Sequence, residues 1–208
     1  MVSSLSLAAI GLTGRAASAS FSSSVYLGGP MTPVRQMASA DLDRIGEIDR
    51  SEHITQQYKS RGAALELIDV DLRAPRWGEP GEHTVRTYID SWKPLIEAGG
   101  VLLGAFDGDR LVGFAICEPP GASLSEGVAN FAVLYVTRTH RGKGIASPLT
   151  NEVVRLARAR GAQRLYVSAT PTRTTVDFYL KHGFEPLATP NERLLALEPD
   201  DIHMERTL

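Results

Sequence analysis

The chain has 208 residues, of which 43% are hydrophobic and 22% are charged, and its formal net charge is -2. These values fit one folded domain with its own core and exclude a disordered or strongly basic protein. The small net charge gives no general reason to expect nucleic acid or a membrane surface as the partner. The single cysteine, Cys117, excludes an internal disulfide and offers no zinc motif, so we predict no metal site and a cytoplasmic location.

The first thirty residues differ from the rest of the chain. They are rich in Ser, Ala and Gly, and they carry one charge, Arg15, and no acidic residue. A serine-rich leader with few acids is typical of an organellar transit peptide, and the short apolar run before residues 17–19 is similar to a weak secretory signal. We expect residues 1–30 to be a disordered extension or a targeting leader, in which case organellar import is possible, and residues 31–208 to form one domain.

From residue 31 onward, apolar spacing predicts a mixed α/β domain without internal repeats. The stretch 54–77 fits either a hairpin that turns at Arg61-Gly62 or a continuation of the preceding helix, and we favour the hairpin. The predicted elements in chain order are a strand at 32–37, a helix at 41–48, this hairpin, a helix at 83–98, a hairpin with strands at 101–106 and 111–117, a strand at 131–136, a helix from 145 to the glycine at 161, a strand at 164–169, a helix at 172–182 and a strand at 202–208.

The strand at 131–136 is apolar throughout, which indicates burial on both faces at the centre of a sheet. The hairpin before it has the turn Asp107-Gly108-Asp109, in which glycine supplies the positive φ value that a tight turn needs. Hairpins require antiparallel pairs, so the sheet is not a simple succession of parallel strands.

A basic turn with two glycines joins the central strand to the following helix, at Arg141-Gly142-Lys143-Gly144-Ile145-Ala146. The first N–H groups of a helix have no partner within it, so such a turn can cradle a phosphate. The stretch contains no GxxxxGK[ST] motif, and it departs from the dinucleotide fingerprint at Ser147. Taken alone, the glycines could equally form an ordinary strand-to-helix turn.

Three segments together resemble the GCN5-related N-acetyltransferases (GNAT). The family motif [RQ]-x-x-G-x-[GA] is matched by Arg141, Gly144 and Ala146, and residues 178–184, FYLKHGF, are similar to the family's FYxKxGF segment. Residues 34–42 are similar to the family's first strand and helix. The resemblance implies a mostly antiparallel, twisted sheet with a central splayed strand pair and flanking helices, and acetyl-CoA as the acyl donor.

The resemblance also implies roles for particular residues. Splaying after Val136 would leave backbone N–H groups of Leu134, Tyr135 and Val136 free to hold the acetyl carbonyl and the pantetheine amides. The pyrophosphate would lie on Arg141, Gly142, Lys143, Gly144, Ile145 and Ala146. Tyr179 would act as the acid toward the leaving thiolate, since a phenol is protonated at neutral pH.

Two positions depart from the family pattern. Asn130 stands where some members carry a catalytic Glu, and an amide cannot serve as a general base. Arg173 and Thr175 occupy positions where the family often has Asn and Ala. The sequence therefore identifies no base, although Glu52, His53 and the acids around Asp177 are conceivable and water-mediated deprotonation would need none of them.

We predict an enzyme that transfers an acetyl or other short acyl group from acyl-CoA to a primary amine, directly in a ternary complex. The acceptor is a small molecule or a protein, and a homodimer is left open. A non-catalytic acyl-CoA-binding module is the alternative, and a dinucleotide-dependent oxidoreductase is a distant third. Fold-level analogy alone names no acceptor.

Overall fold

The structure is a computed structural model that describes residues 32–208, and the expectations for residues 1–30 lie outside the described residues. Its elements in chain order are β1 (Val34–Met37), the 3₁₀ helix η1 (Ser39–Glu47), β2 (Glu52–Arg61), β3 (Ala64–Ala74), α1 (Val85–Glu97), β4 (Val101–Asp107), β5 (Arg110–Glu118), β6 (Val128–Val136), the 3₁₀ turn η2 (Arg138–His140), α2 (Ala146–Ala159), β7 (Arg164–Ala169), α3 (Arg173–Lys181), β8 (Glu185–Pro186), α4 (Glu192–Leu197) and β9 (Ile202–Thr207).

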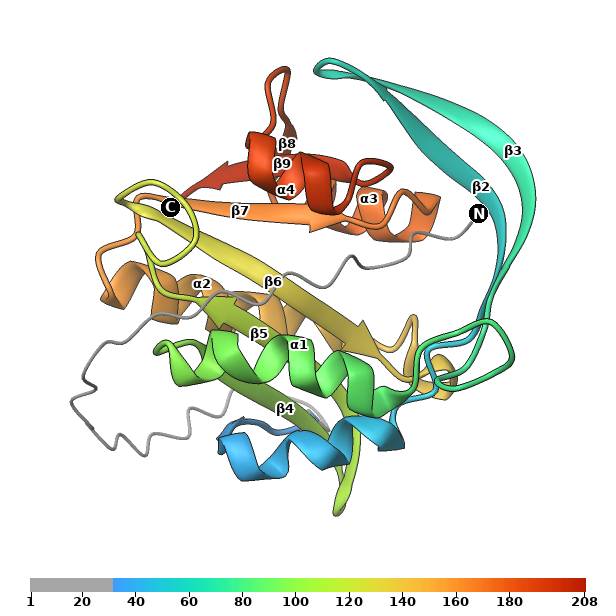
Figure 1. Ribbon diagram of the computed structural model, residues 1–208, viewed down its shortest axis with the longest axis vertical. Coiled ribbons are helices and arrows are strands. Elements are labelled where there is room, and N and C mark those ends of the chain that lie inside the picture. Colours follow the sequence, from blue (N-terminus) through green and yellow to red (C-terminus); the bar gives the residue numbers. More distant parts are fainter. Residues whose placement is uncertain (1–31) are drawn as a thin grey trace.

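Seven strands form one sheet in the order β1-β4-β5-β6-β7-β9-β8, and β2 and β3 pair separately as a two-stranded ribbon. Neighbouring strands of the large sheet are antiparallel except β6 and β7, which are parallel. Figure 1 shows α1 and α4 in front of this sheet and α2 and α3 behind it. The predicted fold class, a mostly antiparallel sheet with flanking helices, is confirmed.

The sheet separates two apolar clusters. Behind it, α2 and α3 pack through side chains that include Leu149 and Val176. In front of it, η1 and α1 pack through Ile45, Ile89 and Trp92. Helices with one apolar stripe cover each face in this way because each stripe must be removed from water. Side chains on the two faces of β6 therefore pack in different clusters, one with α2 and α3 and the other with η1 and α1.

The parallel pair β6 and β7 is joined only at its start. Its register covers residues 128–130 of β6 against residues 164–166 of β7, and the two strands then diverge in Figure 1. The pairing of β6 with β5 shifts between Ile116/Val133 and Glu118/Asn130, so two residues of β6 oppose one of β5. Such a bulge bends its strand. The splay therefore begins after Asn130, earlier than the expected position after Val136.

The ribbon β2–β3 stands apart from the seven-stranded sheet and curves along the side on which β6 and β7 separate (Figure 1). It docks on the turn between β7 and α3, where the Tyr58 N–H donates to Pro171 O at 2.8 Å. The Tyr58 hydroxyl donates to Asp177 Oδ1 at 2.8 Å, and Arg173 Nη1 donates to Gln56 Oε1 at 2.6 Å. The expected hairpin is thus confirmed, and it closes one side of the splay.

The other predicted elements are also present, with small shifts at their ends. The expected helix at 41–48 is a 3₁₀ helix at Ser39–Glu47, and the central strand starts at Val128 rather than 131. Sequence reasoning missed α4 and β8, which have six and two residues. Segments this short carry too few residues to show a periodicity.

Candidate active site

The backbone of β6 offers hydrogen-bond donors to the splay. The Thr137 N–H donates to Val112 O at 2.9 Å, on the β5 side of the strand. Because donors alternate in direction along a strand, the N–H groups of Leu134 and Val136 point to the other side, where β7 has moved away. The Tyr135 N–H points toward β5. Two of the three predicted residues therefore present backbone donors to the gap.

The turn from 141 to 146 has the geometry of an anion cradle. Gly142 and Gly144 have φ values of 74° and 81°, and no heavy atom lies within 4 Å of where a Cβ would stand on either residue. No side chain caps the start of α2. Among residues 32–208, the N–H groups of residues 142–146 donate to no backbone carbonyl. Uncapped donors at a helix start favour a bound phosphate.

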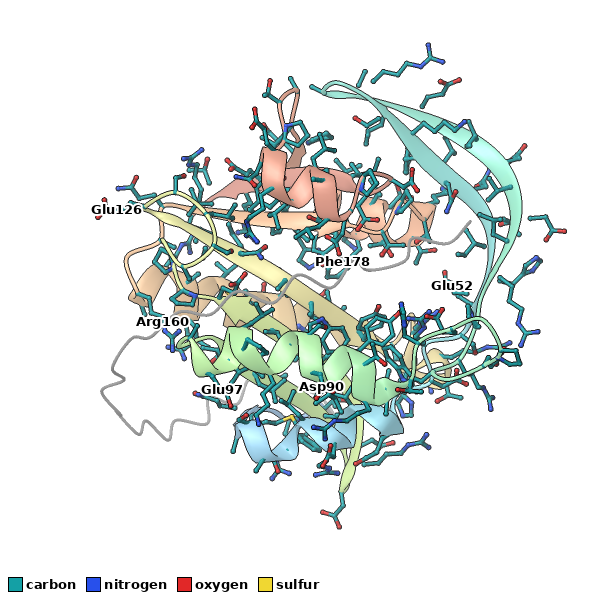
Figure 2. All side chains as sticks on the ribbon, in the orientation of Figure 1. Glu52, Asp90, Glu97, Glu126, Arg160 and Phe178 are labelled. Carbon is teal, nitrogen blue, oxygen red and sulfur yellow. The ribbon has the colours of Figure 1, made fainter. Side chains whose placement is uncertain are left out.

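Two cations of this turn behave differently. The Arg141 guanidinium donates to Val136 O, Glu52 Oε2 and Arg50 O at 3.1, 2.9 and 2.9 Å, so it ties the start of β2 to the end of β6. Figure 2 shows Glu52 beside the base of β2, between the ribbon and the sheet. Lys143 is exposed and forms no ion pair within the described part of the chain. Lys143 is therefore the side chain free to approach a phosphate.

We expect Arg141→Gln to lower the free energy of unfolding by about 1–3 kcal/mol, because several partly buried acceptors lose their donor. Urea unfolding measures this change. Arg61→Gln is the matched control, since the ion pair of Arg61 with Glu66 is exposed and should contribute little. Equal loss in both variants would contradict a tethering role for Arg141.

Tyr179 lies behind the sheet on α3, within a cluster of aromatic rings. It is 4% exposed and packs edge-on against Phe131 and Phe184. Its hydroxyl forms no hydrogen bond with another residue in 32–208. Burial, followed by the charge of Asp201, raises the pKa of Tyr179 well above that of a free phenol.

The end of α3 lies beside the start of α2. His182 Nε2 is 3.1 Å from Ser147 Oγ, and His182 Nδ1 is 2.8 Å from Phe178 O. The side chains of Leu134 and Val136 pack on the same rear cluster. The cradle, the free β6 donors and Tyr179 thus border one continuous region of the rear face and the splay.

The front face of the splay is aromatic and polar. Tyr135 projects forward against Trp77 and Phe114, with ring centroids 5.5 and 5.6 Å apart, and burial raises the pKa of Tyr135 to about 12. Nearby, the buried Arg50 donates to Glu82 Oε2 at 2.6 Å and to Tyr88 Oη at 3.0 Å. This ion pair holds the loop before α1 against the start of β2.

Sequence reasoning missed an acidic pair, Glu198 and Asp201, at the opening of the splay. Ile202 is opposite Ala169, so Asp201 lies at the carboxyl end of β7. Burial, followed by the charges of Glu198 and Asp200, raises the pKa of Asp201 to about 8. The sequence EPDD gave no signal, because acids before a strand are ordinarily solvated turn residues.

The acids and amides considered from sequence are engaged elsewhere. Glu52 is paired with Arg141, His53 Nε2 lies 2.7 Å from Asp71 Oδ1 on the exposed ribbon, and Asp177 accepts from Tyr58. At the closed end of the splay, Asn130 Nδ2 donates to the buried Glu118 at 2.6 Å. These contacts give each side chain a structural partner.

Arg173 and Thr175, the two departures at the start of α3, also have defined contacts. Arg173 reaches the ribbon, as described above, and the Thr172 side chain accepts from the Thr175 N–H and caps the helix. Arg173 therefore joins α3 to the ribbon, and Thr175 takes part in the cap at the start of α3.

A cavity of about 420 Å³ lies at the base of the ribbon and is lined by Ser51, Glu52, His53, Arg73, Arg76, Glu79 and Arg138. Its arginines are partly neutralised, since Arg73 pairs with Glu79 at 3.3 Å and Arg76 pairs with Asp49 at 3.2 Å. The cavity adjoins the Arg141 tether, and its mixed charge indicates no single class of ligand.

Comparisons with known proteins identify the family and the fold of this chain. The family model described as "Acetyltransferase (GNAT) family" matches residues 58–184. N-alpha-acetyltransferase 30 from Schizosaccharomyces pombe is 27% identical over 123 residues, which cover 57% of this chain and 73% of that protein.

Solved structures share the fold at low sequence identity. A nourseothricin acetyltransferase has a TM-score of 0.61 and 17% identity, over 84% of this chain and 96% of its own. The PaiA N-acetyltransferase of Thermoplasma acidophilum, solved with coenzyme A, has a TM-score of 0.52 and 19% identity, over 84% and 98%. The family match spans more than half of the sequence and includes both the cradle and the Tyr179 segment, and the chain therefore belongs to the acetyltransferase (GNAT) family.

Proposed function

We propose that the splay between β6 and β7 is the site of acyl transfer from acetyl-CoA, the family's acyl donor, to a primary amine in a ternary complex. The observation that carries this proposal is the continuity of the free cradle at 142–146, the unpaired donors of β6 and Tyr179. The cofactor enters from the α2 and α3 side. The amine then approaches from the α1 and α4 side, because that face of the gap is not taken by the cofactor.

The chain's own groups supply two parts of the chemistry. Leu134 and Val136 N–H groups hold the acyl carbonyl and the pantetheine, and a donor at the carbonyl oxygen stabilises the tetrahedral intermediate. The Tyr179 hydroxyl donates a hydrogen bond to the departing sulfur. Its raised pKa means that it keeps its own proton through the step, because a buried phenolate is costly.

The acceptor is a primary amine of a small molecule or a protein. A relative named as an N-alpha-acetyltransferase supports including free peptide amino termini among the candidates. The test is an acetylation assay against alkyl amines, polyamines, aminoglycosides and short peptides, with product mass detection. Amine-dependent CoA release supports the proposal, whereas tight acetyl-CoA binding without release for any amine would indicate a binding module.

We expect changes in the ribbon β2–β3 to weaken binding of the amine acceptor more than binding of acetyl-CoA. Arg173→Ala removes the 2.6 Å contact with Gln56 and should raise the KM for the amine severalfold, with the Kd for acetyl-CoA unchanged. Lys59→Ala is the control, because Lys59 is exposed and lies on β2, the strand that carries Gln56. Steady-state kinetics and calorimetry measure the two constants, and a larger effect on acetyl-CoA would contradict this assignment.

We also propose a cytoplasmic location. Cys117 is buried and burial raises the pKa of its thiol to about 12, which suits a reducing compartment and an unreactive thiol. No helix within residues 32–208 has the length and apolar character to cross a bilayer.

A further inference from the structure

Acyl transfer requires a group that removes a proton from the attacking amine, and the residues discussed above leave that role unfilled. We propose that Asp201 is this proton acceptor, a role that rests on the proposed acyl transfer at the splay. The amine that it serves is a basic one, cationic before it reacts. Asp201 is thereby assigned as a catalytic residue that touches the amine nitrogen.

The position of Asp201 follows from the sheet. β9 runs beside β7, and the pair Ala169–Ile202 places Asp201 at the carboxyl end of β7, where the splay is open. Ile202 and Met204 face the rear cluster, whereas His203 contacts Tyr166 on the other face. Asp201 immediately precedes β9, in the turn that joins α4 to β9, and α4 lies on the side proposed for the amine (Figure 1).

The negative charge of Asp201 acts on both tyrosines that border the splay. Its charge contributes to the raised pKa of Tyr135 from the front and of Tyr179 from the rear. Glu198 lies beside it, and the Asp201 N–H donates to Glu198 O at 3.2 Å. Together with the register of β9 against β7, this places Asp201 at the open end of the gap between β6 and β7.

No cation among residues 32–208 pairs with Asp201. Arg50, the guanidinium whose charge acts on Tyr135, is already held by Glu82 and Tyr88. Glu198 and Asp200 add negative charge, and His203 Nε2 lies 3.1 Å from Glu198 O. An unpaired carboxylate beside like charges attracts a cationic amine and readily accepts its proton. Asp201 is expected to have a pKa of about 8, close to the range in which a general base is most effective.

The proposed step balances as follows. An ammonium group transfers one proton to the Asp201 carboxylate, and the neutral amine nitrogen attacks the acyl carbonyl carbon. The new C–N bond forms, the C–S bond breaks, and the electron pair leaves on sulfur. The second nitrogen proton neutralises this thiolate as CoA departs, with the Tyr179 hydroxyl donating a hydrogen bond to sulfur. Asp201 then returns its proton to water.

The test compares Asp201→Asn with Glu192→Gln in the full chain. An alkyl amine accepted by the wild type is paired with its β-trifluorinated analogue, which is much less basic and largely neutral at pH 7. We expect Asp201→Asn to lower kcat at least 100-fold for the alkyl amine and less than tenfold for the analogue, because the analogue arrives without the extra proton. Glu192→Gln, an exposed acid-to-amide change on α4, should stay within about threefold for both amines.

Two further measurements complete the test. The wild-type kcat at saturating alkyl amine should fall as the pH drops below about 8, because Asp201 becomes protonated, and this dependence should disappear in Asp201→Asn. An unchanged Kd for acetyl-CoA and an unchanged unfolding midpoint establish that Asp201→Asn is folded and binds the acyl donor.

Two results would overturn the assignment. Equal rate losses for both amines would show a structural role, and an unchanged pH dependence in Asp201→Asn, with its loss in Glu198→Gln, would move the base to Glu198. Failure of the wild type with every amine would instead refute the proposed function itself, so the two failures are distinguishable.

Discussion

Replacement of Gly144 by aspartate is expected to weaken acetyl-CoA binding at least 100-fold, about 2.8 kcal/mol at 25 °C. Gly144 has a φ of 81°, a conformation that side chains rarely adopt, and the space where its Cβ would stand is free of other atoms. That space is the proposed pyrophosphate position. The new carboxylate would fill it and repel the phosphates. Calorimetric titration with acetyl-CoA measures the loss.

The matched control for this variant lies at the other end of the same helix. Gly161 has a φ of 83° and equally open surroundings, so Gly161→Asp imposes the same backbone strain without approaching the cradle. Both variants should lose similar stability in thermal unfolding. If the Gly161 and Gly144 variants bind acetyl-CoA alike, the cradle is not the pyrophosphate site.

Tyr179→Phe is expected to lower kcat about 100-fold, within the range for loss of a positioned proton or hydrogen-bond donor. The ring and its contacts with Phe131 and Phe184 persist, so the Kd for acetyl-CoA should change less than threefold. Stability should change little, because the hydroxyl forms no hydrogen bond with another residue in 32–208 that the variant would lose. Single-turnover kinetics at saturating acetyl-CoA isolates the chemical step.

Tyr166→Phe is the control for hydroxyl loss from a buried tyrosine. Its hydroxyl lies 2.8 Å from His203 Nδ1 and accepts from the Asn191 N–H at 3.2 Å, so this variant should lose stability. We expect no hundredfold loss in rate. A wild-type rate in Tyr179→Phe would exclude Tyr179 from the reaction, and the β6 donors would then carry the stabilisation of the leaving group alone.

Local patterns in the sequence were sufficient for most of the fold. The hairpin turn at Gly108, the apolar stripe of α2 and the turn after α3 each depend on neighbours within a few residues, and all three are present. The cradle at 142–146 belongs to the same class. A strand, two glycines and an uncapped helix start are consecutive in sequence, so their geometry follows from local backbone conformation.

Local sequence patterns did not predict which way the side chain of Arg141 points. Arg141 matches the family motif and was expected at the pyrophosphate, yet its guanidinium contacts Val136 O, Arg50 O and Glu52. Two of these partners, Arg50 and Glu52, lie 91 and 89 residues earlier in the chain. A long flexible side chain takes the best acceptors that the fold brings within reach, and those acceptors are set by where β2 begins beside the end of β6.

The sequence by itself determined most of the secondary structure and the cradle, because these depend on contiguous residues, and it indicated the family through three short segments. Only the tertiary structure decided where the splay begins and which acid faces it. A bulge opposite β5 separates β6 from β7 after Asn130, and the pairing of β9 with β7 carries Asp201 to the open end. These placements depend on register between strands far apart in the chain, and register is fixed by packing of the whole sheet rather than by local sequence.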